Sequence, residues 1–310
     1  MNHRDIVCED LNLAIDDLQR QGFRLDLIYP ADEPMAALLT RGDEAVRVTT
    51  PAAPLLPDGL PAFRPEFVLT KAATSAGQGR AGMLYRDLVP GRLGGRYIAS
   101  HITIPEGGPV ADWVHYHRVA LQMIYVRSGW VRVVYEDQGD PFVMHAGDLV
   151  LQPPLIRHRV LESSGGLEVV EISAPALHET FADHDLELPN DEQLGRMFGA
   201  QRFLRHVAAD TQWTGFNGGE AQETAIAEAT GGLAEVRTIR PAGAATLNFA
   251  AHDGELVFGF VVDGAARLGD RELGSADAFV VRPCEEWTLS ELSSDFRLLH
   301  VTTARLDVGA

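Results

Sequence analysis

Two segments decide the fold: HYHRVALQMIYVRSG, residues 115–129, and GDLVLQPPLIRHRV, residues 147–160. Successive residues of a β-strand point to opposite faces, so His115 and His117 can present both imidazoles to one point. His158 follows a Pro-Pro turn and returns to that point only if the strands fold back, as they do in a closed barrel. The two segments therefore suggest a metal site inside a β-barrel.

The flanking sequence has the same β character. From Phe67 onward, short apolar or alternating runs are separated by Gly, Pro and Asp, as in RYIASHITI, WVRVVYE and LEVVEIS. Many short strands at this spacing predict an all-β barrel or sandwich. One helix is predicted over residues 190–198, NDEQLGRMF, because Asn190 is a good N-cap residue.

The β pattern restarts near residue 203, which indicates an internal repeat. The matching pairs occur in the same order at nearly the same spacing: FVLTKA (67–72) with FLRHVA (203–208), GGRYIASHITIPEGG (94–108) with GGLAEVRTIRPAGAA (231–245), MIYVRSGWVRV (123–133) with FGFVVDGAARL (258–268), and AGDLVLQPP (146–154) with SADAFVVRP (275–283). The sequence thus predicts a duplicated β domain.

The start of the chain differs from both repeats. Residues 5–20 have nearly helical apolar spacing before Gly22, residues 23–29 and 44–50 resemble strands, and residues 51–65 contain five prolines. We therefore expect a small α/β extension with a Pro-rich strap at residues 1–62, a metal-binding barrel at 63–180 and a second barrel at 181–310.

The arrangement resembles the cupin superfamily, of the RmlC-like jelly-roll type. Its first motif is matched by Gly108, His115, His117, Gln122 and Gly129, with one extra residue after Gly108, and its second by Gly147, Pro153 and His158. The resemblance covers residues 67–175 and, through the repeat, implies a mainly β bicupin of two tandem double-stranded β-helix barrels. It also implies a homodimer.

The resemblance implies one divalent transition metal per chain, held by His115, His117, Gln122 and His158. Gln122 stands where the family usually has Glu, so the ligand set is neutral and leaves the metal its full charge. Such a site should favour anionic or enolisable substrates. Iron is expected first, with manganese, nickel or zinc as alternatives. Gln122 has a second possible role, a hydrogen bond to a metal-bound water.

The second repeat has lost this ligand pattern. Counting from its glycine and turn positions puts Ala250, Val257 and Trp287 in place of His115, Gln122 and His158, with His252 in place of His117. We therefore expect a degenerate, metal-free second barrel.

Four residues are candidates for binding substrate: Arg96, His101, Gln152 and Arg157. Either arginine can anchor a carboxylate bidentately, or serve only as a surface ion-pair partner. His178 and His184, after the first barrel, are expected to be solvated loop residues. No catalytic residue is assigned.

Three functions remain open at this point. The first is a dioxygenase-like oxidoreductase acting on a small organic acid, enol or aromatic molecule. The second is a non-redox metal-dependent isomerase, lyase or hydrolase, and the third is a small-molecule-binding module without turnover.

Composition excludes other classes of partner. The net charge of −18 repels phosphate backbones and anionic membranes, so neither nucleic acid nor membrane is expected as a partner. The N-terminal sequence has no signal-peptide pattern, which predicts a cytoplasmic protein. Cys8 and Cys284 lie near opposite ends of the chain and support neither a disulfide framework nor a zinc ribbon.

Overall fold

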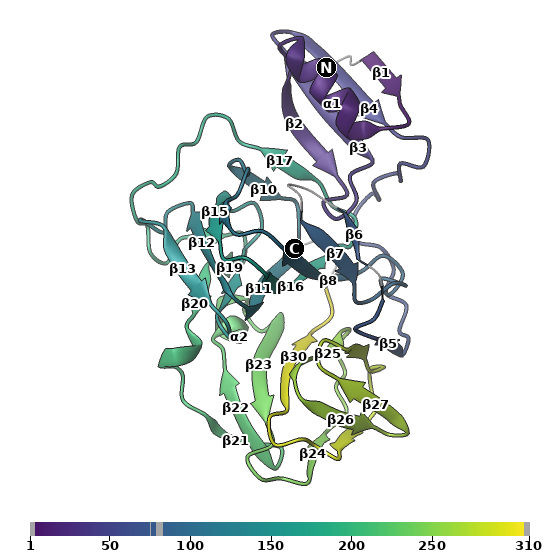
Figure 1. Ribbon diagram of the computed structural model, residues 1–310, viewed down its shortest axis with the longest axis vertical. Coiled ribbons are helices and arrows are strands. Elements are labelled where there is room, and N and C mark those ends of the chain that lie inside the picture. Colours follow the sequence, from purple (N-terminus) through teal and green to yellow (C-terminus); the bar gives the residue numbers. More distant parts are fainter. Residues whose placement is uncertain (1–3, 75, 79–82, 307–310) are drawn as a thin grey trace.

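The computed structural model describes residues 4–74, 76–78 and 83–306, and it is mainly β-structure (Figure 1). An N-terminal unit lies at one end of the molecule, and two β-barrels follow it. The predicted fold class, two tandem barrels with an α/β extension, is confirmed. No helix in the described ranges is long and apolar enough to cross a membrane.

The N-terminal unit is a helix packed on a small sheet. It comprises β1 (Arg4–Val7), α1 (Leu11–Arg20), β2 (Arg24–Tyr29), β3 (Ala36–Arg41) and β4 (Glu44–Thr49). The helix begins later than the spacing predicts, because residues 4–7 pair with β4 as a parallel strand. Asp10 then caps α1, its Oδ1 accepting a hydrogen bond from the Leu13 N–H at 3.0 Å.

The first barrel follows. Its elements are β6 (Gly77–Gln78), β7 (Leu84–Asp87), β8 (Ile98–Ile104), β9 (Gly108–Pro109), β10 (His115–His117), β11 (Leu121–Ser128), β12 (Trp130–Tyr135), β13 (Phe142–His145), β14 (Leu149–Leu151), β15 (His158–Ser163), β16 (Leu167–Ala174), β17 (Thr180–Ala182) and β20 (Leu204–His206), with the hairpin β18 (Met197–Phe198) and β19 (Gln201–Arg202) beside it. One sheet has the order β20-β14-β11-β16-β8-β7-β6. The other runs β17-β10-β15-β12-β13 and continues through β2 into the N-terminal unit.

The second barrel repeats this plan. It comprises β5 (Val68–Thr70), η2 (Ala208–Asp210), β21 (Thr214–Phe216), β22 (Gly219–Glu223), α2 (Ile226–Ala229), β23 (Ala234–Arg240), β24 (Thr246–Phe249), β25 (Val257–Asp263), β26 (Ala265–Leu268), β27 (Arg271–Gly274), β28 (Ala278–Val280), β29 (Trp287–Ser290) and β30 (Arg297–Thr303). Its sheets have the orders β21-β22-β23-β30-β25-β28-β5 and β24-β29-β26-β27.

The barrels exchange strands, so the predicted boundaries at residues 63 and 181 do not coincide with the sheets. β5 pairs with β28 of the second barrel, and β20 pairs with β14 of the first. These exchanged strands are FVLTKA and FLRHVA, the first matching pair of the repeat. Each therefore occupies the same edge position, but on the other repeat's sheet.

The predicted helix over residues 190–198 is wrong. Asn190 does not cap a helix, because it is bonded across the loop to Asp137. Its Oδ1 accepts from the Asp137 N–H at 2.8 Å, and its Nδ2 donates to Asp137 Oδ1 at 2.7 Å. Residues 197–198 form β18 instead.

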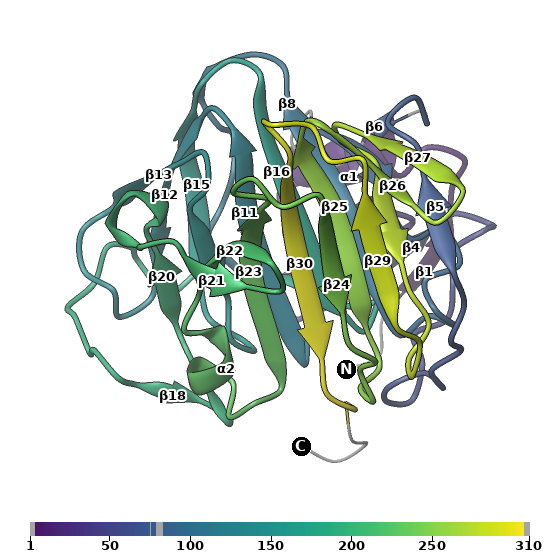
Figure 2. The ribbon, with the colours of Figure 1, turned by 90° about the horizontal axis from the view of Figure 1, so that it is seen from below.

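The large sheets of the two barrels pack against each other through an apolar core (Figure 2). Alternation along β11 explains how one strand serves two cores. Leu121, Met123 and Tyr125 join the core between the barrels, whereas Val126 joins the interior of the first barrel. Because both faces are buried, β11 reads in the sequence as a nearly continuous apolar run.

Candidate metal centre

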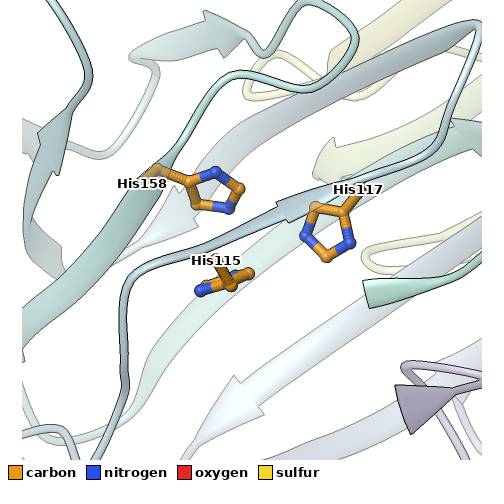
Figure 3. Close-up of side chains that lie close together, drawn as sticks. All are labelled: His115, His117 and His158. Atoms are coloured by element: carbon orange, nitrogen blue, oxygen red, sulfur yellow. The ribbon is translucent and has the colours of Figure 1, made fainter. Parts of the chain in front are cut away.

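Three histidines meet inside the first barrel, and we call them the histidine cluster: His115 and His117 from β10, and His158 from β15 (Figure 3). His115 and His158 face each other directly across the two antiparallel strands. One ligand nitrogen from each residue lies within 4.8 Å of the others. The side chains are 1–6% exposed, so a metal held here is shielded from bulk water.

Each ring of the cluster is oriented by a hydrogen bond through Nδ1. His115 Nδ1 donates to the Trp113 carbonyl at 2.7 Å, and His158 Nδ1 donates to the Ile156 carbonyl at 3.1 Å. His117 Nδ1 forms a hydrogen bond with the Thr180 hydroxyl at 3.0 Å. The two carbonyl partners leave the lone pair of neutral His115 and His158 on Nε2, and a bond through Nδ1 is how metal-ligating histidines are usually supported. The donor set therefore fits a divalent transition metal.

The cluster lines a cavity of about 80 Å³. Most of the wall is apolar: Met83, Tyr85, Ile102, Ile104, Ile124, Val131, Val133, Met144, Val160, Leu167 and Val169. Ala31, in the loop after β2, also lines it. The N-terminal unit thus contributes to the wall of the first barrel's cavity.

Gln122 and Glu171 form a pair on neighbouring strands of this cavity. Gln122, predicted as a ligand, is 2% exposed, and its Nε2 donates to Glu171 Oε1 at 3.0 Å. Ser173 Oγ donates to the same carboxylate oxygen at 3.2 Å. The cavity therefore has the carboxylate that position 122 lacks, displaced to β16. Sequence reasoning missed Glu171, although an acidic residue in the apolar run LEVVEIS was a signal. Metal ligation by Gln122 stays a prediction.

Gln152 also lines the cavity, and its role in binding substrate stays a prediction. It is 1% exposed, and its Nε2 donates to the Tyr135 hydroxyl at 2.8 Å. The other amide atom, Oε1, is buried and has no hydrogen-bond partner among the described residues. Burial raises the pKa of Tyr135, whose ring stacks on His158 with centroids 5.4 Å apart.

His101, predicted to bind substrate, faces away from the cavity. Ile102 and Ile104, on the same strand β8, line the cavity. Because successive strand residues point to opposite faces, His101 points toward the second barrel, where its ring lies near Phe260. There its Nδ1 accepts from Arg86 at 3.0 Å and its Nε2 donates to Glu168 at 2.7 Å. Burial, and then the Arg86 charge, lower its pKa to about 4.

The two arginines expected to bind substrate do not line the cavity either. Arg96 is buried between the barrels, where its guanidinium makes bonds of 2.9 and 2.7 Å to the Glu255 carboxylate. Arg157 precedes the inward-facing His158 and so points outward, where it bonds Asp183 at 2.9 Å. Both side chains are ion-pair partners, which is the alternative role that the sequence left open for them.

His178 is not the solvated loop residue that the sequence suggests. It is 6% exposed, and its ring meets the His117 ring edge to face at 5.5 Å. Its Nδ1 donates to the Pro175 carbonyl at 2.9 Å, and burial lowers its pKa. His184 is more exposed and lies 3.0 Å from Asp26 of the N-terminal unit.

The corresponding region of the second barrel is filled by aromatic rings. Phe249 faces Trp287 across β24 and β29, as His115 faces His158 in the first barrel. Their rings stack with centroids 3.7 Å apart and planes 2° apart. Phe249, not Ala250, is therefore the counterpart of His115, so the sequence alignment was wrong by one residue. His252 consequently does not replace His117, and its Nδ1 accepts from the Gly254 N–H at 2.9 Å.

Comparisons with known proteins agree with this geometry. Residues 100–173 match the family model of the cupin domain. No curated protein sequence matches the chain. Both of these findings concern sequence alone.

Among solved structures, a putative glyoxylate-induced protein from Pseudomonas aeruginosa is similar, with a TM-score of 0.57 and 15% identity, covering 83% of this chain and 97% of that one. Oxalate decarboxylase from Bacillus subtilis gives a TM-score of 0.56 at 11% identity, covering 86% and 87% of the two chains. Protein Ylba from E. coli gives 0.55 at 11% identity, covering 83% and 98%. Residues 100–173 are thus similar to the cupin domain family, and the chain as a whole has a fold similar to that of these solved structures.

Proposed function

We propose that the protein is a metal-dependent enzyme, a dioxygenase-like oxidoreductase that acts on a small organic molecule in the first barrel. One observation carries this proposal: three buried imidazoles, each oriented through Nδ1, converge on the wall of a mainly apolar cavity. An iron ion is the expected occupant, with manganese, nickel or zinc as alternatives, and His115, His117 and His158 would hold it. A homodimer remains the expected assembly.

When bound, a redox-active metal with open coordination positions supplies Lewis acidity and one-electron chemistry with dioxygen. The chain's own residues supply the setting. The apolar wall excludes water from the reacting molecule, and Gln122 carries no charge toward the cluster. Glu171, bonded to Gln122 and Ser173, is a carboxylate able to accept a proton within the cavity.

Glu171 also supports a second candidate function, a non-redox isomerase or lyase. A carboxylate in the same cavity as a metal-polarised carbonyl can remove a neighbouring proton without any change of oxidation state. The two functions differ in their requirement for dioxygen. Activity of zinc-loaded protein without oxygen supports the non-redox candidate, and oxygen uptake by iron-loaded protein supports the dioxygenase.

The first experiment is elemental analysis of untagged protein, because a His-tag would contribute ligands of its own. We expect about one transition metal per chain, lost in His158→Ala. His145→Ala is the matched control, since His145 is exposed on β13 of the same barrel and lies outside the cluster. Absence of bound metal after loading, or equal metal in the two variants, contradicts the proposal and favours a binding module without turnover.

A further inference from the structure

The wall of the first barrel's cavity has a marked chemical bias. Among the described residues that line it there is no lysine or arginine. The ionisable groups are the histidine cluster, Tyr135, Tyr85 and Glu171. A substrate that reaches the cluster therefore lies mainly against aliphatic and thioether side chains, and among the described residues Glu171 supplies the one carboxylate on that wall.

Nearby arginines cannot change this bias without breaking other interactions. Arg96 is fixed between the barrels by Glu255 and the Leu306 carbonyl. Arg157 is fixed on the outer face by Asp183 and lies over the Tyr116 ring, 4.3 Å from its centroid. A negatively charged substituent on the substrate would thus be buried without a cationic partner on the wall, which is strongly unfavourable.

Gln152 adds a polar requirement at the end of the cavity near His158. Its Nε2 is used by Tyr135, and its Oε1 is a buried acceptor without a donor among the described residues. A buried acceptor of this kind is stabilised by a ligand that brings an O–H or N–H group. It discriminates against ligands that bring only an acceptor.

We propose that this cavity binds a mainly apolar substrate with no negative charge beyond its metal-binding group, and with an O–H or N–H that donates to Gln152 Oε1. This inference rests on the proposed metal-dependent function. It restricts the class of anionic substrates expected from the sequence. A negative charge fits the cavity in the group that binds the metal, but not in the part of the substrate that lies against the apolar wall. Gln152 is then a specificity-determining residue.

The test compares two catechols of similar shape on zinc-loaded protein under anaerobic conditions, by isothermal titration calorimetry. 4-Methylcatechol carries a methyl group where 3,4-dihydroxybenzoate carries a carboxylate. We expect the neutral molecule to bind at least about thirtyfold more tightly, because the carboxylate would be desolvated against apolar wall and would approach Glu171. Glu171→Gln should narrow the difference by about tenfold, since it removes the repelling charge and keeps the shape.

Gln152→Leu tests the polar requirement. We expect 4-methylcatechol to bind about tenfold more weakly to this variant, which lacks the acceptor. The matched control is Gln201→Leu: Gln201 is also a buried amide with an unpartnered Oε1, but it lies outside this cavity. The control should leave the affinity unchanged.

The proposed function and the substrate preference fail under different results. Protein that binds no zinc at His115, His117 and His158 contradicts the proposed function itself. Protein that binds zinc, yet binds neither catechol or binds 3,4-dihydroxybenzoate at least as tightly as 4-methylcatechol, overturns the inference and leaves the metal site intact. Equal effects of Gln152→Leu and Gln201→Leu remove Gln152 from the proposal.

Discussion

The pair formed by Gln122 and Glu171 predicts a large, pH-dependent penalty for Gln122→Glu, the substitution that would restore the usual cupin residue. The amide nitrogen lies 3.0 Å from the Glu171 carboxylate oxygen. In the variant two carboxylates would share that contact. At an effective dielectric constant of about 20, two charges 3.0 Å apart repel by about 5–6 kcal/mol.

Protonation limits this penalty, and the limit depends on pH. Placing a proton on a glutamate of ordinary pKa, about 4.3, costs about 5 kcal/mol at pH 8 but only about 1 kcal/mol at pH 5. The proton-sharing pair binds more protons in the folded variant than in the unfolded chain, so lowering the pH stabilises the fold. We therefore expect the variant to lose about 3–5 kcal/mol relative to the parent at pH 8 and about 1 kcal/mol at pH 5.

The assay is urea unfolding of chelator-treated protein, because a bound cation would neutralise the pair and hide the effect. The double variant Gln122→Glu/Glu171→Gln reverses the donor and acceptor at unchanged charge and should recover to within about 1 kcal/mol of the parent. Gln122→Met is the control that removes the bond without adding charge. Its loss of about 1–3 kcal/mol should vary much less between pH 8 and pH 5 than that of Gln122→Glu, since it adds no second carboxylate. A loss for Gln122→Glu that is equal at both pH values, or no recovery in the double variant, refutes this reasoning.

Three further predictions concern the packing of the barrels. The pKa of His101 is lowered to about 4 in the folded protein, whereas a histidine in the unfolded chain is protonated near pH 6.5. The free energy of unfolding should therefore fall by about 3 kcal/mol as the pH drops between these values. In urea unfolding, the free energy of unfolding of His101→Gln should depend less on pH than that of the parent. Trp287→Ala should cost about 3–5 kcal/mol by removing the stack with Phe249, and metal content should stay unchanged. Arg96→Met should lower the free energy of unfolding by about 3–5 kcal/mol, because it leaves Glu255 buried without its partner. In the same unfolding assay, the double variant Arg96→Met/Glu255→Leu should recover most of that loss.

The duplication and the histidine cluster were predictable because their signals are local and periodic. Every matching pair of the repeat falls on strands that hold equivalent places in the two barrels, such as β11 and β25, each paired to the long strand that ends its repeat. His115 and His117 share a face by strand alternation, whereas the return of His158 to the same point was implied by the resemblance, whose second motif it matches.

Strand alternation also predicts the direction of two of the residues that were expected to bind substrate. His101 differs by one position from Ile102, which lines the cavity, and Arg157 differs by one from His158. Each therefore points away from the cavity, and proximity along the chain was a misleading guide. Gln152 lies beyond the end of β14, at the turn into the second motif, and its inward direction depends on that turn.

Other features depend on contacts between distant segments and have no local signal. β5 and β20 can each pair with the edge of either barrel's sheet, because the two edges are equivalent. The local sequence therefore does not indicate that the two strands are exchanged. Glu171 becomes part of the site only through the pairing of β16 with β11, which brings it diagonally opposite Gln122. His178 reaches His117 from a loop whose path the sequence does not specify.

The two barrels use equivalent interior positions for opposite purposes. Register places His300 on β30 where Glu171 lies on β16, because Val257 pairs with Thr302 as Gln122 pairs with Ser173. Burial lowers the pKa of His300 to about 3, and neither of its ring nitrogens has a hydrogen-bond partner among the described residues. A polar residue at this position is therefore not enough to make a site. In the first barrel Gln122 and Glu171 support each other by a hydrogen bond, whereas in the second barrel the Phe249 ring packs against His300 instead. Since buried polar groups are costly unless they are paired, the supported polar interior of the first barrel is where binding and chemistry are expected, and the second barrel packs against it through the apolar core that the two share.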